Sequence, residues 1–225
     1  MQVRAFCVGQ FQANCFLVTD PETGASALVD VGEDGEVARR LGERGPARPL
    51  EAILLTHAHV DHAGGLAQVQ AERDAPTFLG SGDRALFATL PQQGSWFGMP
   101  WLDHPTGRVD TWVDDGAIVT VGALRLSFLA TPGHTPGHGI WVGTGHAFAG
   151  DLVFAGSVGR TDLPFGDPRA MTASLLRLGD LPDATVLHCG HGPDTTVGEE
   201  IRSNPFLGAL RRARGWPDPA GQGWW

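Results

Sequence analysis

The stretch Thr56-His57-Ala58-His59-Val60-Asp61-His62 places four metal-competent side chains within six residues. It follows the end of a predicted buried strand and precedes Ala63-Gly64-Gly65, which opens a predicted helix. Imidazoles two residues apart on an extended or turning segment project to one side, and Asp61 with His62 can reach a second point nearby. One run can therefore supply two metal ions. An ordinary polar loop is less favoured, because this density of ligands directly after a buried strand rarely arises by chance.

Three later segments supply further donors, each after a predicted strand or apolar segment. His134 lies in the Gly/Pro turn of residues 130–138, Asp151 follows the apolar residues 146–148, and His191 lies in His188-Cys189-Gly190-His191-Gly192. Rigid strand ends are suited to hold the ligands of an open catalytic metal. Nitrogen and oxygen ligands without paired thiolates suit zinc, manganese or iron.

The remaining histidines have plainer interpretations. His104 and His146 are predicted to be structural. His138 shares a turn with a candidate ligand and is predicted to support that ligand or the fold. His188 stays open between ligand and structural residue, because it lies three residues from another candidate.

Composition and charge exclude several classes of protein. The 225 residues include 16 basic and 25 acidic side chains, for a formal charge of −9, and no Lys/Arg cluster occurs, so nucleic acid is not an expected partner. The first residues lack the features of a secretory signal, and no apolar stretch approaches bilayer length, so we expect a cytoplasmic protein without a membrane span. Cys7, Cys15 and Cys189 form a scattered, odd set that indicates free thiols. For Cys189, a small buried residue is favoured over a reactive or ligand role.

Short apolar runs alternate with segments of helical periodicity, which predicts an α+β protein. Strands are expected at residues 16–19, 27–31, 52–55, 124–130, 139–142 and 185–188. Helices are expected at residues 35–44, 64–73, 82–90, 168–178 and 205–214. This order resembles two β-rich halves that are each covered by helices, a four-layer αββα sandwich.

Two stretches read as loops: residues 91–112, with four aromatic side chains, and the tail 216–225, which ends in Gly-Trp-Trp. Residues 1–215 are expected to form one catalytic domain. The aromatic residues of the tail fit either a free end or a contact with the body or with a second subunit, so a homo-oligomer is one expectation.

The motifs in this order resemble those of the metallo-β-lactamase superfamily. Thr56 to His62 resembles its HxHxDH signature, and TPGHTPGH (131–138), Gly150-Asp151 and Gly190 to Gly192 resemble its later metal motifs. The likeness to short glyoxalase II-like proteins extends from residues 11–15 through 156–162 to 204–207. It implies the αββα fold and hydrolysis of a glutathione thioester such as S-lactoylglutathione. Residues 192–225 are too few for the additional helical domain of full-length glyoxalase II, which contributes glutathione contacts there.

The resemblance also implies a ligand set for two divalent metal ions. Position by position, the first ion is held by His57, His59 and His134, the second by Asp61, His62 and His191, and Asp151 bridges them. Zinc is expected, with iron or manganese as alternatives. Two ions that share a solvent molecule lower its pKa toward neutrality, which supplies metal-bound hydroxide for attack on a thioester carbonyl. Asp61 is predicted to be catalytic, because its carboxylate can orient that nucleophile.

The sequence is also compatible with other functions. A mononuclear iron persulfide dioxygenase on the same scaffold would use His57, His134 and Asp151 and leave positions open for oxygen and sulfur. A β-lactamase or a ribonuclease is less favoured, and so is a module whose metals only brace the fold. Ser157 and Thr135 have no evident base partner, so nucleophilic catalysis by a hydroxyl is not expected.

The substrate is expected to be a small-molecule thioester that is derived from glutathione or related to such a compound. Two features near the site bear on how this substrate is bound. Arg160 and Asp162 are interpreted as an ion pair that braces a Gly-rich loop, in preference to a grip on a substrate carboxylate. The aromatic segment 95–112 is predicted either to wall the site or simply to pack over the sandwich.

Overall fold

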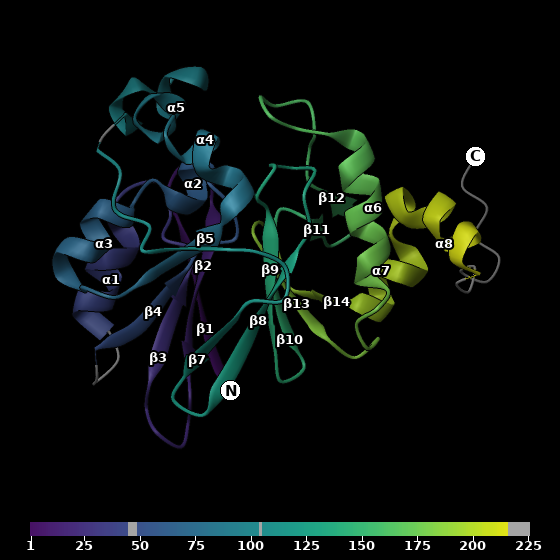
Figure 1. Ribbon diagram of the computed structural model, residues 1–225, viewed down its shortest axis with the longest axis horizontal. Helices are drawn as coiled ribbons and strands as arrows, with labels where there is room; N and C mark the ends of the chain where they lie inside the picture. Colours follow the sequence, from purple (N-terminus) through teal and green to yellow (C-terminus); the bar gives the residue numbers. More distant parts are fainter. Residues whose placement is uncertain (45–48, 104, 216–225) are drawn as a thin grey trace.

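Strands rich in aliphatic and aromatic residues form two six-stranded sheets that pack face to face in the computed structural model, which describes residues 1–44, 49–103 and 105–215 (Figure 1). The first sheet has, in spatial order, β1 (Gln2–Val8), β2 (Ala13–Thr19), β3 (Ser26–Val29), β4 (Leu50–Leu54), β5 (Thr77–Gly80) and β6 (Thr111–Val113). The second has β14 (Thr195–Thr196), β13 (Val186–Cys189), β10 (His146–Gly150), β9 (Gly139–Gly143), β8 (Leu124–Ala130) and β7 (Ile118–Val121). A separate hairpin pairs β11 (Val153–Phe154) with β12 (Ser157–Val158).

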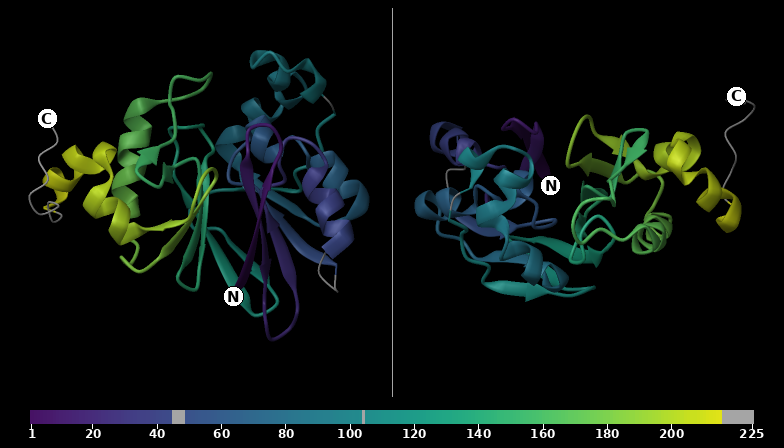
Figure 2. Two further views of the ribbon diagram at one scale, coloured as in Figure 1. Left: turned by 180° about the vertical axis from the view of Figure 1, so that it is seen from behind. Right: turned by 90° about the horizontal axis from the view of Figure 1, so that it is seen from above.

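Helices cover the outer face of each sheet, and Figure 2 shows the two groups on opposite sides of the molecule. On the first sheet lie α1 (Glu36–Arg44), α2 (Val60–Ala63), α3 (Leu66–Glu72), α4 (Arg84–Phe87) and α5 (Leu90–Trp96), with the 3-10 turns η1 (Ser81–Asp83) and η2 (Pro100–Leu102). On the second lie α6 (Pro168–Leu178), α7 (Val197–Ser203) and α8 (Gly208–Arg214), with η3 (Pro205–Leu207).

Three apolar clusters correspond to the three interfaces of a four-layer sandwich. Phe16, Phe128 and Trp141 belong to the cluster between the two sheets. Leu41 and Leu66 belong to the cluster between the first sheet and its helices, and other buried residues fill the space between the second sheet and α6 and α7. Burial of apolar surface at these interfaces is the main stabilising contribution. The predicted α+β, αββα fold is confirmed.

Strand direction explains why the predicted donors meet. Strands β3, β4 and β5 are parallel. In the second sheet, β8 and β10 both run antiparallel to β9, and β13 is parallel to β10, so these three strands end at one edge. The candidate donors follow the C-terminal ends of β4, β8, β10 and β13. Loops at such strand ends are a common place for sites in layered folds.

The prediction of a loop over residues 91–112 was wrong in part. Helix α5 begins at Leu90, η2 follows at Pro100, and β6 begins at Thr111. Pro91 stands in the first turn of α5, where its missing N–H costs no hydrogen bond. Gly94 lets the backbone approach closely, because a Cβ there would lie 2.5 Å from the carbonyl oxygen of Met99. Tertiary contacts thus stabilise a helix that the Gly- and Pro-rich sequence does not indicate.

Other boundaries also differ from the predictions. The helix expected at 64–73 is α3, and α2 precedes it as a separate turn that was not predicted. The region 82–90 divides into η1, α4 and the start of α5. The strands β1, β5, β6, β7 and β14, the hairpin of β11 and β12, and the helix α7 were not predicted. The tail 216–225 and His104 lie outside the described residues. No helix in the described ranges is long and apolar enough to cross a membrane.

Candidate metal centre

The four donors after β4 lie close together. The rings of His57, His59 and His62 are buried, with ring centroids 4.9 Å apart for His57–His59 and 4.3 Å for His57–His62. Helix α2 begins at Val60, so Asp61 lies in its first turn. Two histidines on the loop and two donors on the helix thereby face a common space, as the spacing predicts.

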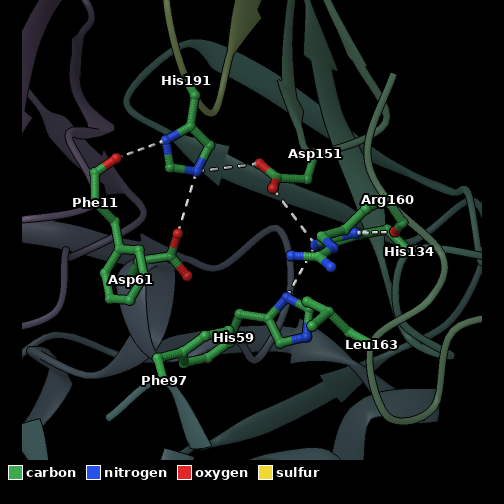
Figure 3. Close-up of a pocket in the computed structure, with 9 residues that line it drawn as sticks. All are labelled: Phe11, His59, Asp61, Phe97, His134, Asp151, Arg160, Leu163 and His191. Carbon is green, nitrogen blue, oxygen red and sulfur yellow. Dashed lines mark hydrogen bonds and ion pairs between the residues drawn. The ribbon is translucent and has the colours of Figure 1, made fainter. Parts of the chain in front are cut away.

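The donors from the second half of the chain complete this cluster. Asp151 places Oδ2 3.4 Å from His134 Nε2 and Oδ1 3.3 Å from His62 Nε2. His191 Nε2 lies 3.1 Å from Asp61 Oδ2, and His59 Nδ1 lies 2.9 Å from His134 Nε2. Figure 3 shows the carboxylates of Asp61 and Asp151 on either side of the His191 imidazole.

All seven candidate donors therefore meet, and they fall into overlapping groups of three. Within each group the donor atoms lie within 4.8 Å of one another. The groups are His57, His59 and His134; His57, His62 and Asp151; and Asp61, His62 and His191. The donor atoms fit two adjacent ions with one shared carboxylate, a binuclear arrangement of His and Asp donors.

Hydrogen bonds orient four of the five imidazole rings so that one nitrogen of each faces the centre. The Nδ1 of His134 donates to the carbonyl oxygen of Arg160 at 2.7 Å, and the Nδ1 of His191 donates to that of Phe11 at 3.1 Å. Because a carbonyl can only accept, Nδ1 carries the proton, and in the neutral ring Nε2 keeps its lone pair. The same orientation is common in metal-binding histidines.

A single aspartate orients two of the three other rings, those of His57 and His62. Asp30 Oδ2 accepts from His62 Nδ1 at 2.9 Å and from the hydroxyl of Thr56 at 2.8 Å. That hydroxyl, whose proton is used, accepts in turn from His57 Nδ1 at 3.0 Å. The Nε2 atoms of His57 and His62 are thereby left to face the centre.

Two buried polar atoms at the centre have no hydrogen-bond partner. They are His57 Nε2 and Asp151 Oδ1, the latter close to His62 but without hydrogen-bond geometry. Leaving such groups unsatisfied costs about 1–3 kcal/mol each, and the geometry is explained if both atoms are metal ligands. The residues present therefore fit a pair of divalent cations.

The charges of the site also favour a cation. Burial lowers the pKa of His57 well below its ordinary range and that of His59 to about 3, so both rings are neutral and able to ligate. Burial alone would lower the pKa of His62 too, but the carboxylates of Asp61 and Asp151 raise it. Burial would raise the pKa of Asp151, but His62, His134 and His191 hold it below its usual value. Positive charge is stabilised between these carboxylates.

Sequence reasoning missed the residues that hold the donor loops in place. Besides Asp30, buried Asp83 accepts from the Ala58 N–H at 2.8 Å and from the Thr135 hydroxyl at 2.9 Å, which joins the loops of His59 and His134. Gln93 accepts from the Val60 N–H at 2.9 Å and donates to the Ala58 carbonyl. The only signal for Asp30 was a charged residue directly after the apolar run 27–29.

Asn14 joins strand β2 to the loop that carries His191. Its Nδ2 donates to the carbonyl oxygens of Cys189 at 3.0 Å and Gly192 at 2.8 Å. Gly190 lies between them, and a Cβ there would lie 2.4 Å from Asp151 Oδ1. A glycine is therefore required where the His191 loop passes the site.

The other histidines and Cys189 take structural positions. The Asp151 N–H donates to His138 Nε2 at 3.1 Å, so His138 supports a donor, as predicted. His188 donates from Nδ1 to Asp194 Oδ2 at 2.8 Å and accepts from His146 Nδ1 at 3.0 Å, away from the seven donors. Burial raises the pKa of the Cys189 thiol to about 12, which removes the thiolate needed for reactivity.

The donors open onto a cavity of about 220 Å³. Within the described ranges its lining comprises Phe11, His59, Asp61, Phe97, His134, Asp151, Arg160, Leu163 and His191 (Figure 3). Phe11 and Phe97 meet edge to face, with ring centroids 5.4 Å apart. Phe97 comes from the aromatic segment predicted either to wall the site or to pack over the sandwich, and it does line the cavity.

Comparison with known proteins agrees with this fold. The family model described as the metallo-β-lactamase superfamily matches residues 8–191. Hydroxyacylglutathione hydrolase GloC of Haemophilus influenzae is 37% identical over 213 residues, which cover 92% of this chain and 98% of that protein.

Two crystal structures are similar over most of the chain. TTHA1623 in a di-iron-bound form gives a TM-score of 0.81 at 37% identity and covers 91% of this chain and 100% of that one. The BLEG-1 B3 metallo-β-lactamase gives 0.82 at 32% identity, with 92% and 100% covered.

The fold and the site together define a metal-dependent hydrolase with a binuclear site of His and Asp donors. The chain belongs to the metallo-β-lactamase superfamily.

Proposed function

We propose that this protein is a thioesterase that hydrolyses an S-acylglutathione, such as S-lactoylglutathione, or a related small thioester. The observation that carries the proposal is the convergence of seven His and Asp donors, five of which line a cavity, with His57 Nε2 and Asp151 Oδ1 buried and unpartnered. Similarity to hydroxyacylglutathione hydrolase GloC over nearly the whole chain supports the choice of substrate class. The activity is assigned to residues 1–215 as one domain.

The proposed ligand set divides the donors between two ions. His57, His59 and His134 would hold the first, Asp61, His62 and His191 would hold the second, and Asp151 would be a ligand of both. Zinc, iron and manganese all suit this mixture of nitrogen and oxygen donors. When bound, the two ions would lower the pKa of a shared water toward neutrality and polarise the thioester carbonyl.

The chain's own residues position the reactants. Asp61, whose side chain is 15% exposed, faces the cavity and accepts a hydrogen bond from the attacking water, which aims an oxygen lone pair at the carbonyl carbon. Phe11, Phe97 and Leu163 supply an apolar wall that excludes bulk water from the scissile bond. The C–O bond to water forms, the C–S bond breaks, and the products are a carboxylic acid and a thiol.

Metal analysis combined with thiol release tests the proposal. Protein purified without added metal is analysed by mass spectrometry for metal content and then assayed for free thiol from S-lactoylglutathione. Two equivalents of metal with thiol release are expected. A metal-loaded protein that opens a β-lactam ring but releases no thiol would refute the thioesterase.

The same experiment separates the iron dioxygenase alternative. A mononuclear site built from His57, His134 and Asp151 would leave the group of Asp61, His62 and His191 with no metal ion to bind. One iron per chain together with oxygen uptake on glutathione persulfide would establish that alternative instead.

A further inference from the structure

The turn between β1 and β2, residues 9–12, lies next to the second group of metal donors. Its Phe11 carbonyl oxygen accepts from His191 Nδ1 at 3.1 Å (Figure 3). The His191 side chain is 27% exposed, compared with 15% for Asp61 and 11% for Asp151. Because the protein encloses this ring less completely, its orientation depends strongly on the Phe11 carbonyl.

Two carboxylates bind three successive main-chain N–H groups of this turn. The Gly9 N–H donates to Glu36 Oε2 at 2.9 Å. The N–H groups of the next two residues, Gln10 and Phe11, donate to the two carboxylate oxygens of Glu33, the second at 3.2 Å. Successive N–H groups that converge on one anion form a concave anion site. In this turn the anion is a side chain of the protein itself.

The Glu33 carboxylate, from the loop between β3 and α1, is the buried one of the two. Glu33 is 1% exposed, whereas the Glu36 side chain is 22% exposed. Burial raises the pKa of Glu33, and the N–H groups of the turn oppose that rise. Gly9 has a φ of +70°, and a Cβ there would overlap the Glu33 carboxylate. Water can replace the Glu36 bond, but the turn closes over Glu33, so the loss of its bonds leaves buried N–H groups unsatisfied.

The carbonyl that orients His134 has a different support. It belongs to Arg160, and the preceding residue, Gly159, packs against the Asp151 carbonyl oxygen. The Arg160 guanidinium pairs with Asp162 through two bonds of 2.7 Å at the surface, as predicted. His134 therefore serves as an internal comparison, because its carbonyl partner is held without a buried carboxylate.

We propose that Glu33 is a positioning residue for the second ion of the metal centre: its carboxylate fixes the main chain of Gln10 and Phe11, and the Phe11 carbonyl thereby holds His191 in its ligating orientation. The inference rests on the proposed function through the ligand role of His191, but it does not depend on which substrate is hydrolysed. Without the carboxylate, the peptide of Phe11 can tilt, and His191 Nδ1 loses the acceptor that fixes its proton. The second ion is then bound more weakly, while the first is retained.

Zinc retention by Glu33→Gln is the main test. The amide keeps the size of the side chain but turns an NH₂ group toward one of the two N–H donors. Protein loaded with two equivalents of zinc is titrated with a chromophoric chelator. We expect the second ion to be released with about 10-fold lower affinity than in wild type, the smaller loss typical of an outer partner of a metal ligand, and the first ion to be unaffected. Excess zinc should restore activity.

Glu36→Gln is the matched control. Glu36 binds the same turn, but it bonds to Gly9, and its exposed carboxylate can be replaced by water. This variant should retain both ions as wild type does. Equal weakening of the second ion in both variants overturns the specific role of Glu33. The proposal is also overturned if Glu33→Gln retains both ions normally or releases them together.

Nuclear magnetic resonance gives a signature that general destabilisation does not produce. In zinc-loaded protein labelled with ¹⁵N, Glu33→Gln should shift the Nδ1–H signal of His191 and leave that of His134 unchanged. Hydrogen exchange of the wild type tests the same contact if the variant does not fold. The amides of Gln10 and Phe11 should then exchange at least about 10-fold more slowly than exposed amides, as expected for buried hydrogen bonds. Unprotected amides or equal shifts of both rings contradict the proposal.

None of these binding measurements requires a substrate, so this inference and the proposed function can fail separately. A second ion that depends on Glu33 supports the inference even if no thioester is cleaved. Thiol release by an enzyme whose second ion is bound equally well with and without the Glu33 carboxylate supports the function and refutes the inference.

Discussion

The two halves of the sandwich supply the metal centre in different ways. The first half contributes four donors from the six residues 57–62, and buried side chains, those of Asp30, Asp83 and Gln93, hold this short run. The second half contributes three donors spread over residues 134–191, and two of them bond to main-chain carbonyls. Buried side chains thus hold the donors of the first half in position, whereas main-chain carbonyls hold two of the three donors of the second half.

Asp151 contacts donors from both halves, and its substitution should have the largest effect on metal content and activity. It contacts His62 from the first half and His134 and His191 from the second. Asp151→Ala removes the carboxylate that we propose is shared by the two ions, so we expect metal content to fall below one equivalent and kcat/KM to fall by about 10³-fold or more. Mass spectrometry and thiol release measure both.

Asp194→Ala is the control for Asp151→Ala. It removes a carboxylate that bonds to His188 and does not line the cavity. It should retain both ions. A fully loaded Asp151→Ala protein would mean that the halves bind metal independently.

Asp61→Asn tests the first half alone and should have the next largest effect. The amide keeps the size of the carboxylate and one oxygen but removes the charge that faces the cavity. We expect activity to fall by about 10²-fold, the loss typical of a positioned group that handles a proton, while most of the metal remains. Full activity in a metal-loaded variant would count against the catalytic role of Asp61.

Asp30→Asn probes the support beneath the first half. Asp30 accepts three hydrogen bonds, two from Thr56 and one from His62, and an amide NH₂ would face one of these donors. Loss of such a partner lowers metal affinity by about 10- to 100-fold. Competition with a chelator measures the change.

Asp20→Asn is the matched control for Asp30→Asn. Asp20 is another buried aspartate just past a strand of the first sheet, and it accepts from Thr23 and Ala123 far from the donors. Its substitution should lower stability but leave metal affinity unchanged. Equal metal loss in both variants would indicate general unfolding.

The same contrast explains what the sequence could predict. Dense donors after a buried strand, and single donors after later strands, are local signals. All seven converging donors could therefore be identified from the sequence, and the order of apolar runs and helical segments indicated the fold class. The supporting roles of Asp30, Asp83 and Gln93 could not be identified, because each acts on segments 25 or more residues away in the chain. An acidic or amide residue outside a motif does not reveal its partner. Helix α5 was missed for the same reason, since the buried hydrogen bonds of Gln93 hold it in place.

The smallest effect on the metal centre should come from His188→Gln, which tests the one histidine of this segment that the sequence left open between ligand and structural residue. His191 faces the donors, whereas His188 bonds to Asp194 and His146 and stacks on Phe148, with ring centroids 4.9 Å apart. We expect His188→Gln to keep both metal ions and activity within about threefold of wild type, while thermal unfolding shows a loss of about 1–3 kcal/mol from the broken buried hydrogen bonds. His191→Gln should show the opposite pattern, with one ion lost and smaller changes in stability. Loss of an ion from His188→Gln would show that the path of the backbone after β13, and not the identity of the donor alone, controls the second half of the site.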